Sequence, residues 1–268
     1  MVDRGPFYGA AMGIEQGSPA VRIAAPPARS FRHALRGGSA TTVHVAEYDL
    51  AEWNPRVVVL DPPQQLGAWC ARAGETEAVV GGFFVRPRGV PLGELWTAGE
   101  RRRSEPFQPP AGPRRSCVLI DGGGVRTAPR RELPRRPRGD LLQAGPLLVA
   151  DGATVVGRDP EGFSSGAGQF DSDITRGRYP RAALGVRDGA AIAVACDGRS
   201  DDDAGLTLSE LASLMLRLGA DSAINLDGGG STSLVSGGRL MNTPREEHGI
   251  ELVAGRPVST AIVFSPRR

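Results

Sequence analysis

The stretch at residues 224–233, INLDGGGSTS, joins a carboxylate, three glycines and three small hydroxyl residues directly after a short apolar run. Glycine leaves its backbone N–H open, so an anionic oxygen can approach the chain closely. We expect Asp227 to act in acid–base or nucleophilic chemistry, or to bind a metal ion. The competing interpretation is a glycine turn beside an incidental aspartate. The backbone of Gly228, Gly229, Gly230 and Ser231 is expected to bind the anion, and Thr232 is a candidate substrate-binding residue.

A second DGGG at residues 121–124 shows that the tetrapeptide alone does not decide between these interpretations. It follows a short apolar run, no helical pattern comes after it, and it is interpreted as a hairpin turn. The copy at Asp227 instead follows a predicted strand–helix–strand unit. That unit comprises a strand over 190–196, a helix over 207–219 with a Thr207/Glu210 capping box, and a strand over 222–226.

Such a strand–helix–strand unit is normally a right-handed crossover between parallel strands. Parallel strands share their carboxyl edge, and ligands bind at that edge in open α/β sheets. Asp197 follows the first strand and Asp227 the second. We therefore expect both carboxylates at one edge, within roughly 10 Å of each other.

The rest of the chain predicts an α/β (α+β) fold in a single domain, with a mixed β-sheet core flanked by helices and a C-terminal β-α-β unit. The domain is expected over residues 41–268, and residues 1–40 are interpreted as a flexible extension because they lack a sustained apolar period. A length of 268 residues is ample for a substantial core. Further strands are expected over 42–48, 56–60, 78–84, 117–120, 145–150 and 181–186, with a short helix over 66–73.

Charge and composition exclude several classes of partner. The net charge is +2 and all 32 basic residues are arginine, so a Gly-Lys-Ser phosphate-binding loop cannot be present. Residues 101–138 carry eleven arginines against three acids, but prolines interrupt the run and no aromatics alternate with the arginines. We interpret this region as solvated loops and expect no nucleic-acid partner. The three cysteines form neither a zinc pattern nor a disulfide framework, and Cys117 and Cys196 are expected to be buried.

The beginning of the sequence lacks the basic start and apolar stretch of a signal peptide, and no segment is long enough to span a membrane. A soluble, cytoplasmic protein is the expectation, or a secreted one if a leader has been removed. The pattern indicates no oligomeric state.

Six short motifs occur along the chain: GGFF at 81–84, GPLL at 145–148, PRAALG at 180–185, DGRS at 197–200, LDGGGS at 226–231 and GRPV at 255–258. Taken together, these motifs resemble the signature of the phosphodiester glycosidases, a family related to the lysosomal uncovering enzyme. The resemblance runs from about Val43 to Phe264. It implies cleavage of the glycosidic bond in a small glycosyl phosphate or a phosphorylated glycan. One departure is Val80, which stands where the family usually has asparagine.

Cleaving a C1–O–P linkage requires a carboxylate as base or nucleophile, and cations with N–H donors to hold the phosphate. Strong general-acid help is less necessary than in other glycosidases because a phosphate monoester is a good leaving group. Asp227 and Asp197 are the candidate carboxylates, and Arg181 and Arg199 the candidate cations. We expect Arg181 to face solvent and to hold phosphate through two N–H groups, with a surface ion pair as the alternative. The other candidate substrate-binding residues are Asn225, Gly82 and Phe83.

Two other functions remain open at this point. One is a non-catalytic module that binds phosphorylated sugars or nucleotides, and the other is a metal-dependent phosphodiesterase that cuts the P–O bond. No cofactor is clearly indicated. Residues 201–203, three consecutive aspartates, form either a divalent-cation site or a solvated acidic loop. The long polar loop over 162–175 suggests a functional role.

Overall fold

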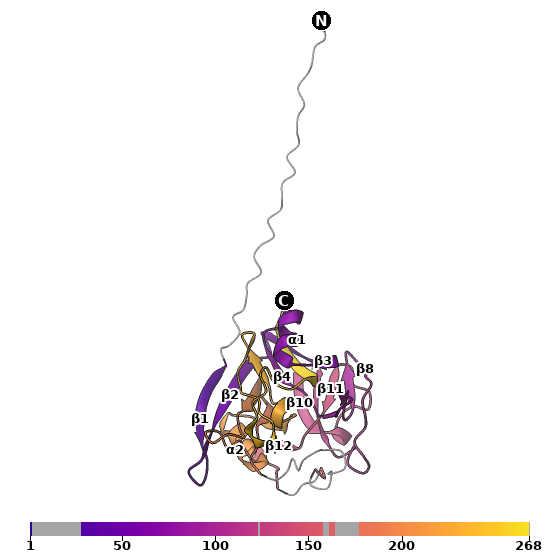
Figure 1. Cartoon of the computed structure of the whole chain (residues 1–268). Helices are drawn as coiled ribbons and strands as arrows, with labels where there is room; N and C mark the ends of the chain where they lie inside the picture. Colours follow the sequence, from indigo (N-terminus) through magenta and orange to yellow (C-terminus); the bar gives the residue numbers. More distant parts are fainter. Residues whose placement is uncertain (2–27, 123, 158–160, 164–176, 268) are drawn as a thin grey trace.

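The apolar runs of the sequence form strands that assemble into three larger sheets, in which neighbouring strands pair antiparallel (Figure 1). The computed structural model describes residues 1, 28–122, 124–157, 161–163 and 177–267. The largest sheet has the order β1-β2-β15-β14-β16-β12-β13. Its strands are β1 (Arg29–Ala34), β2 (Ala40–Asp49), β15 (Ala190–Cys196), β14 (Arg181–Arg187), β16 (Ser222–Asn225), β12 (Leu147–Ala150) and β13 (Ala153–Thr154).

Two five-stranded sheets and one short strand pair complete the β structure. The first has the order β10 (Gly124–Pro129), β9 (Ser116–Asp121), β11 (Asp140–Gln143), β7 (Leu95–Thr97) and β8 (Glu100–Arg101). The second has the order β18 (Arg239–Leu240), β17 (Leu234–Ser236), β4 (Ala78–Val80), β19 (Val258–Pro266) and β3 (Trp53–Gln64). The pair is β5 (Phe84–Val85) with β6 (Val90–Pro91), and 3₁₀ turns lie at Arg130–Glu132, Gly229–Ser231 and Glu247–Gly249.

Helix α2 (Leu208–Arg217) covers one face of the seven-stranded sheet. Its start is the predicted capping box: the Thr207 hydroxyl accepts from the Glu210 N–H, and the Glu210 carboxylate accepts from the Thr207 N–H. Its apolar stripe is buried against strand residues such as Val194. Beyond the helix, Gly219 has a φ of +86°, the left-handed conformation that glycine adopts without strain.

The opposite face of the seven-stranded sheet packs against the sheet that contains β3 and β19. Tyr48 of β2 stacks on Phe264 of β19, with ring centroids 3.8 Å apart, and lies edge-on to Trp53 of β3 at 5.5 Å. Aromatic pairs of this kind add to the burial of apolar surface. The short helix α1 (Leu66–Ala73) packs at the edge of this layer against β3, β4 and β17. An α+β fold is thus confirmed, with β-sheet as its dominant element.

Strands β15 and β16 run parallel to each other because each pairs antiparallel with β14, which lies between them. Cys196, the last residue of β15, is opposite Arg181, and Asn225, the last residue of β16, is opposite Ala183. Both strands therefore end at the same edge of the sheet, and α2 connects them on one face.

The folded part of the chain begins earlier than we expected. Residues 29–34, which the sequence suggested were extension, form β1 and pair with β2 along their whole length. Strand formation also stops earlier than expected at residues 78–84, since β4 ends at Val80 and the glycines that follow lie outside it. Residues 2–27 and 164–176, which hold most of the expected extension and of the polar loop, lie outside the described residues.

The first DGGG forms the predicted hairpin, with Asp121 of β9 opposite Gly124 of β10. All three cysteines are buried and unpaired, as expected for Cys117 and Cys196. Within the described residues, neither α-helix is long and apolar enough to cross a membrane.

Candidate active site

Asp227 lies half-buried just beyond the end of β16. Its backbone N–H donates to the Gly81 carbonyl at 3.0 Å, which fixes the loop after β16 against the loop after β4. Its Oδ1 accepts from the Gly228 N–H at 2.9 Å, and its carboxylate also accepts from Ser231. Burial raises the pKa of Asp227 to about 6, against the opposing effects of the Ser231 bond, nearby arginine charge and the Gly228 N–H. The carboxyl group therefore changes charge close to neutral pH.

Arg256 and Arg86 supply positive charge near this carboxylate. Arg256 donates from Nη1 to Ser231 Oγ at 3.5 Å and pairs with Glu246, whose Oε1 accepts from both Nε and Nη2. Desolvation raises the pKa of Glu246, but the Arg256 hydrogen bond and the charge of neighbouring arginines lower it overall. Glu246 is therefore ionised at neutral pH and holds the Arg256 guanidinium in place.

Arg199 lies on the other side of Glu246, with Nη1 at 3.9 Å from Glu246 Oε2. Its φ of +62° is rare for a residue with a side chain. Its guanidinium donates to the Arg245 carbonyl at 3.1 Å and lies 5.5 Å from the centre of the Tyr179 ring. The DGRS motif thus brings an arginine to the Asp227 loop.

The three glycines after Asp227 act differently from the expected anion cradle. The N–H of Gly228 donates to Asp227, that of Gly229 to the Pro180 carbonyl at 2.9 Å, and that of Ser231 to the Gly228 carbonyl at 3.2 Å. Three of the four amides in this stretch are therefore already used within the protein. Phosphate binding by this backbone stays a prediction, and the observed hydrogen bonds do not favour it for these three donors.

The glycines instead make room for charged side chains. A β-carbon at Gly229 would lie 3.4 Å from Arg199 Nη1, and one at Gly230 would lie 3.0 Å from Glu246 Oε1 and 3.1 Å from Arg256 Nη2. Gly229 also has a φ of +60°. Their missing side chains let the arginines approach the Asp227 loop closely.

Arg181 does not face solvent, so that expectation is wrong. Its side chain is only 3% exposed. Nε donates to the Leu206 carbonyl at 3.0 Å, Nη2 lies 3.5 Å from the Gly177 carbonyl, and the guanidinium lies 5.3 Å from the centre of the Tyr179 ring. These contacts tie the segment before β14 to the segment before α2, so Arg181 stabilises the fold at the site's edge.

Asp197 follows β15 at the predicted edge of the sheet, and its side chain is engaged on both oxygens. Oδ2 lies 2.9 Å from His44 Nε2, and Oδ1 accepts from the Thr243 N–H at 2.6 Å. The residue is 5% exposed. His44 Nδ1 in turn lies 2.7 Å from Ser30 Oγ. Asp197 thus connects β15 to β2 and to the loop that leads to Glu246, while its catalytic role stays a prediction.

Asn225 and Thr232 are buried on either side of the Asp227 loop. Asn225 Nδ2 donates to the carbonyls of Gly145 (3.0 Å) and Leu226 (2.8 Å). Asn225 Oδ1 and Thr232 Oγ1 have no hydrogen-bond partner among the described residues. Their expected contact with substrate stays a prediction, and the observed contacts indicate that Asn225 shapes the loop backbone.

The GGFF segment contacts the Asp227 loop through Gly81, while the residues after it point elsewhere. The Gly82 N–H donates to Thr260 Oγ1 at 3.0 Å, and a β-carbon at Gly82 would lie 2.9 Å from the Gln143 carbonyl. Phe83 packs in a buried aromatic cluster, 6.5 Å from Phe107 and 6.1 Å from Phe163 between ring centroids. These contacts place Phe83 in the core, and its substrate role stays a prediction.

Val80, where the family resemblance leads us to expect asparagine, is buried in β4 between β17 and β19. The acidic run at residues 201–203 also has a structural contact. Asp203 Oδ1 accepts from the Thr42 N–H at 2.6 Å and from Arg32 Nη1 at 2.5 Å. Within the described ranges, no group of three or more His, Cys, Asp and Glu side chains is placed to hold a metal ion.

Three residues near Asp227 were not predicted from the sequence as members of the site: Arg86, Glu246 and Arg256. Arg256 lies in the GRPV motif and Arg86 lies two residues after GGFF, so their position beside two of the quoted motifs was the available signal. Glu246 had no such signal, because only the fold brings residues 243–256 against the Asp227 loop.

Comparison with known proteins adds family context to this geometry. A family model described as phosphodiester glycosidase matches residues 73–265. The SPbeta prophage-derived uncharacterized protein YomE from Bacillus subtilis is 39% identical over 130 residues, which cover 47% of this chain and 19% of YomE. The match thus spans only a small part of that relative's length.

Two solved structures have the same fold. The zebrafish N-acetylglucosamine-1-phosphodiester alpha-N-acetylglucosaminidase catalytic domain, auto-inhibited by its pro-peptide, matches with a TM-score of 0.69 and 19% identity, covering 90% of this chain and 83% of that chain. A hypothetical protein from Synechocystis matches with a TM-score of 0.66 and 20% identity, covering 91% and 64%. At these identities the likeness shows the fold alone.

Proposed function

Because the chain belongs to the phosphodiester glycosidase family, we propose that it hydrolyses the bond between the anomeric carbon and the bridging oxygen of a glycosyl phosphodiester. The observation that carries this proposal is the environment of Asp227. A half-buried carboxylate with a raised pKa lies within the electrostatic influence of Arg256 and Arg86, and Arg199 approaches Gly229 in the same loop. A carboxylate and several cations are what cleavage of a C1–O–P linkage requires.

In the proposed reaction, the C1–O bond breaks and its electron pair leaves with the phosphate, which becomes a phosphate monoester. Positive charge develops at C1, where the oxygen of a water molecule is finally bonded. The leaving phosphate gains negative charge as the bond breaks, so cations placed there stabilise the transition state more than the bound substrate. Arg256 and Arg199 are suited to this task because Glu246 holds Arg256 and lies near Arg199.

We assign Asp227 the role of the carboxylate that acts at C1, as base towards water or as nucleophile. Both roles require the ionised form, and a pKa of about 6 leaves most of the group ionised at pH 7 while keeping it basic. Asp197 is assigned a positioning role, since both of its carboxylate oxygens already have partners within the protein. Arg181 is assigned the same kind of role because its guanidinium binds main-chain carbonyls.

The proposed substrate is a small glycosyl phosphodiester or a phosphorylated glycan. The sugar in the name of the zebrafish enzyme suggests N-acetylglucosamine as the first sugar to test. The substrate panel therefore begins with alkyl diesters of α-N-acetylglucosamine 1-phosphate and extends to the glucose, galactose and mannose equivalents.

The decisive experiment is turnover of this panel in water enriched in oxygen-18, followed by mass analysis of both products. Label in the sugar supports the proposal, because it requires C1–O cleavage. Label in the phosphate would show P–O cleavage and support the phosphodiesterase alternative. Saturable binding without turnover of any panel member would instead support the non-catalytic binding module. Asp227→Asn is the control, and we expect it to bind substrate with little turnover.

A further inference from the structure

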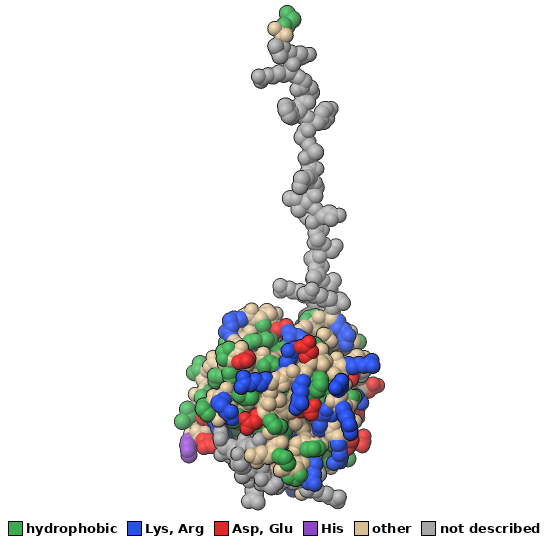
Figure 2. Space-filling view, turned by 90° about the vertical axis from the view of Figure 1, so that its right-hand side faces the viewer, with side chains coloured by type: hydrophobic (Ala, Val, Ile, Leu, Met, Phe, Trp, Pro, Cys, Tyr) green, Lys and Arg blue, Asp and Glu red, His purple; other side chains and the backbone are tan. Residues whose placement is uncertain are grey.

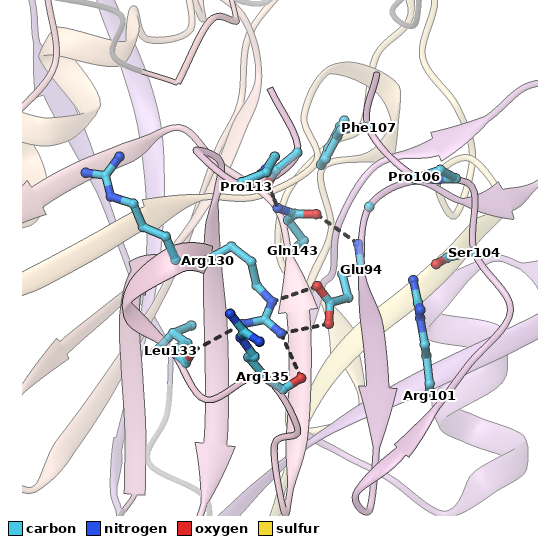
Figure 3. A pocket seen from close by; sticks show the side chains of 13 residues that line it. Glu94, Arg101, Ser104, Pro106, Phe107, Pro113, Arg130, Leu133, Arg135 and Gln143 are labelled. Carbon is cyan, nitrogen blue, oxygen red and sulfur yellow. Dashed lines mark hydrogen bonds and ion pairs between the residues drawn. The ribbon is translucent and has the colours of Figure 1, made fainter. Parts of the chain in front are cut away.

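A polar cavity lies away from Asp227, in the arginine-rich region that the proposed function does not use. It has a volume of about 490 Å³ and is lined by residues from 93–143 (Figure 3). That volume is in the range of sites that hold small ligands. Figure 2 views the side of the molecule on which β8 lies, and blue arginine side chains are spread over that face.

The lining of this cavity is strongly positive. Four arginines, Arg101, Arg130, Arg131 and Arg135, face one carboxylate, Glu94, which leaves a formal net charge of +3. Within the described part of the chain, the Arg101 and Arg135 side chains make no ion pair or hydrogen bond. Figure 3 shows them on either side of the central Glu94–Arg130 pair. Arg130 pairs with Glu94 and Arg131 lies 3.5 Å from Glu132, so Arg101 and Arg135 are the guanidinium groups left to attract an anion into this concave site.

Arg130 and Glu94 form an ion pair in the wall of the cavity, so the excess positive charge of the lining comes from the other arginines. Arg130 Nε donates to Glu94 Oε2 at 2.6 Å, and its other nitrogens donate to the Pro134 and Arg135 carbonyls at 3.1 Å. Glu94 also accepts from the Trp96 indole N–H at 2.7 Å. The Arg130 N–H groups therefore hold the backbone at Pro134 and Arg135, which fixes the point from which the Arg135 side chain extends.

We propose that this cavity is a second binding site, for the phosphoryl group of a phosphate-bearing ligand, with Arg101 and Arg135 as its principal contacts. A phosphoryl dianion offsets most of the excess charge, and its oxygens accept from guanidinium N–H groups in pairs. Ser104, which lies beside Arg101 in Figure 3, adds a hydroxyl at the same wall. Free phosphate and a phosphorylated sugar share this chemistry. The proposal does not depend on the reaction assigned to Asp227.

The cavity is separated from the Asp227 loop by β11 and the GGFF segment. Gln143, at the end of β11, lines the cavity with its side chain, and its carbonyl packs against Gly82. Gln143 Oε1 accepts from the Glu94 N–H at 3.0 Å, and Nε2 donates to the Gly112 carbonyl. The Gln143 side-chain amide therefore stabilises the wall of the cavity. Because this wall separates the cavity from the Asp227 loop, variants at Arg101 and Arg135 are expected to change the cavity and leave the Asp227 site intact.

Inorganic phosphate at constant ionic strength is the first probe, with isothermal titration calorimetry as the main readout on the full chain. Fluorescence of Trp96 gives a local second readout, because this indole donates to Glu94, and Trp96→Phe shows which part of the signal is local. The double variant Arg101→Gln/Arg135→Gln is compared with Arg239→Gln, a matched exposed arginine in β18. Glucose 1-phosphate, acetate and chloride complete the set of ligands.

We expect saturable phosphate binding that weakens about 10-fold or more in the double variant, is unchanged in Arg239→Gln, and persists in Arg256→Gln. Acetate should bind more weakly. Tighter binding of glucose 1-phosphate than of phosphate would identify a phosphosugar as the ligand, and the reverse would identify free phosphate. The proposal is overturned by no saturable phosphate binding above the chloride control, or by equal affinity in the folded double variant. The single variants repeat the comparison if the double variant does not fold.

Discussion

Replacing Gly230 by alanine puts a methyl group where Glu246 and Arg256 now approach the chain. The new β-carbon would lie 3.0 Å from Glu246 Oε1, 3.0 Å from Leu252 Cδ1 and 3.1 Å from Arg256 Nη2. These distances are shorter than the 3.5–4.0 Å or so of ordinary packing contacts. All three neighbours are the ends of side chains, so we expect them to move while the backbone stays in place.

The expected effect of Gly230→Ala falls on catalysis more than on stability. A catalytic group misplaced by about 1 Å costs on the order of 100-fold in rate, so a shift of about 0.3–0.5 Å predicts a fall in kcat/KM of about 4- to 10-fold, or about 0.8–1.4 kcal/mol. The φ of Gly230 lies outside the left-handed region, so alanine fits the backbone. We expect the free energy of unfolding to change by no more than about 1 kcal/mol, equivalent to roughly 2–4 °C in Tm.

The assay compares Gly230→Ala with Gly122→Ala, a glycine-to-alanine change in the other DGGG. A β-carbon at Gly122 meets nothing within 4 Å, so this control should retain wild-type kcat/KM. Both variants are tested on the glycosyl phosphodiester that the substrate panel identifies, with thermal denaturation as the measure of folding. Wild-type kcat/KM in folded Gly230→Ala would refute the reasoning that Glu246 and Arg256 serve the reaction.

Two further variants test the structural roles assigned at the edge of the site. Arg181→Lys should lower the free energy of unfolding by about 1–3 kcal/mol in urea denaturation, because lysine lacks the Nε–H group that donates to the buried Leu206 carbonyl. Unchanged stability would contradict that assignment. Asp197→Asn should cost about 2–4 kcal/mol by the same measurement, because it weakens the buried contacts to His44 and Thr243. If Asp197→Asn is as stable as the wild type but has no turnover, Asp197 acts in catalysis and the positioning role is wrong.

Much of the fold could be predicted from local patterns. The capping box at Thr207 and Glu210 located the start of α2, and the hairpin at 121–124 followed from a glycine turn between two apolar runs. Strand β1 could not be found this way, because Arg29–Ala34 is largely exposed at a sheet edge and lacks an apolar stripe. Its existence depends on pairing with β2, which local sequence does not encode.

The candidate site shows the same division between local and long-range information. The position of Asp227 followed from its motif, and the raised pKa follows from burial that only the fold produces. Arg181 and Arg256 look equivalent in the sequence, each beside a proline in a short motif. Their roles differ because Arg181 donates hydrogen bonds to main-chain carbonyls, whereas Arg256 donates to the side chains of Ser231 and Glu246. Contacts between residues ten or more positions apart decide which arginine reaches the site.

The most direct test of the central claim is the pH dependence of kcat/KM for the wild type and Asp227→Asn. If ionised Asp227 acts at C1, the wild-type rate should be level above its raised pKa of about 6 and fall tenfold per pH unit below it. Asp227→Asn should lose activity by about 100- to 10,000-fold and show no inflection there. A rate that falls as the pH rises through 6, or an active Asp227→Asn enzyme with the wild-type profile, would contradict the account.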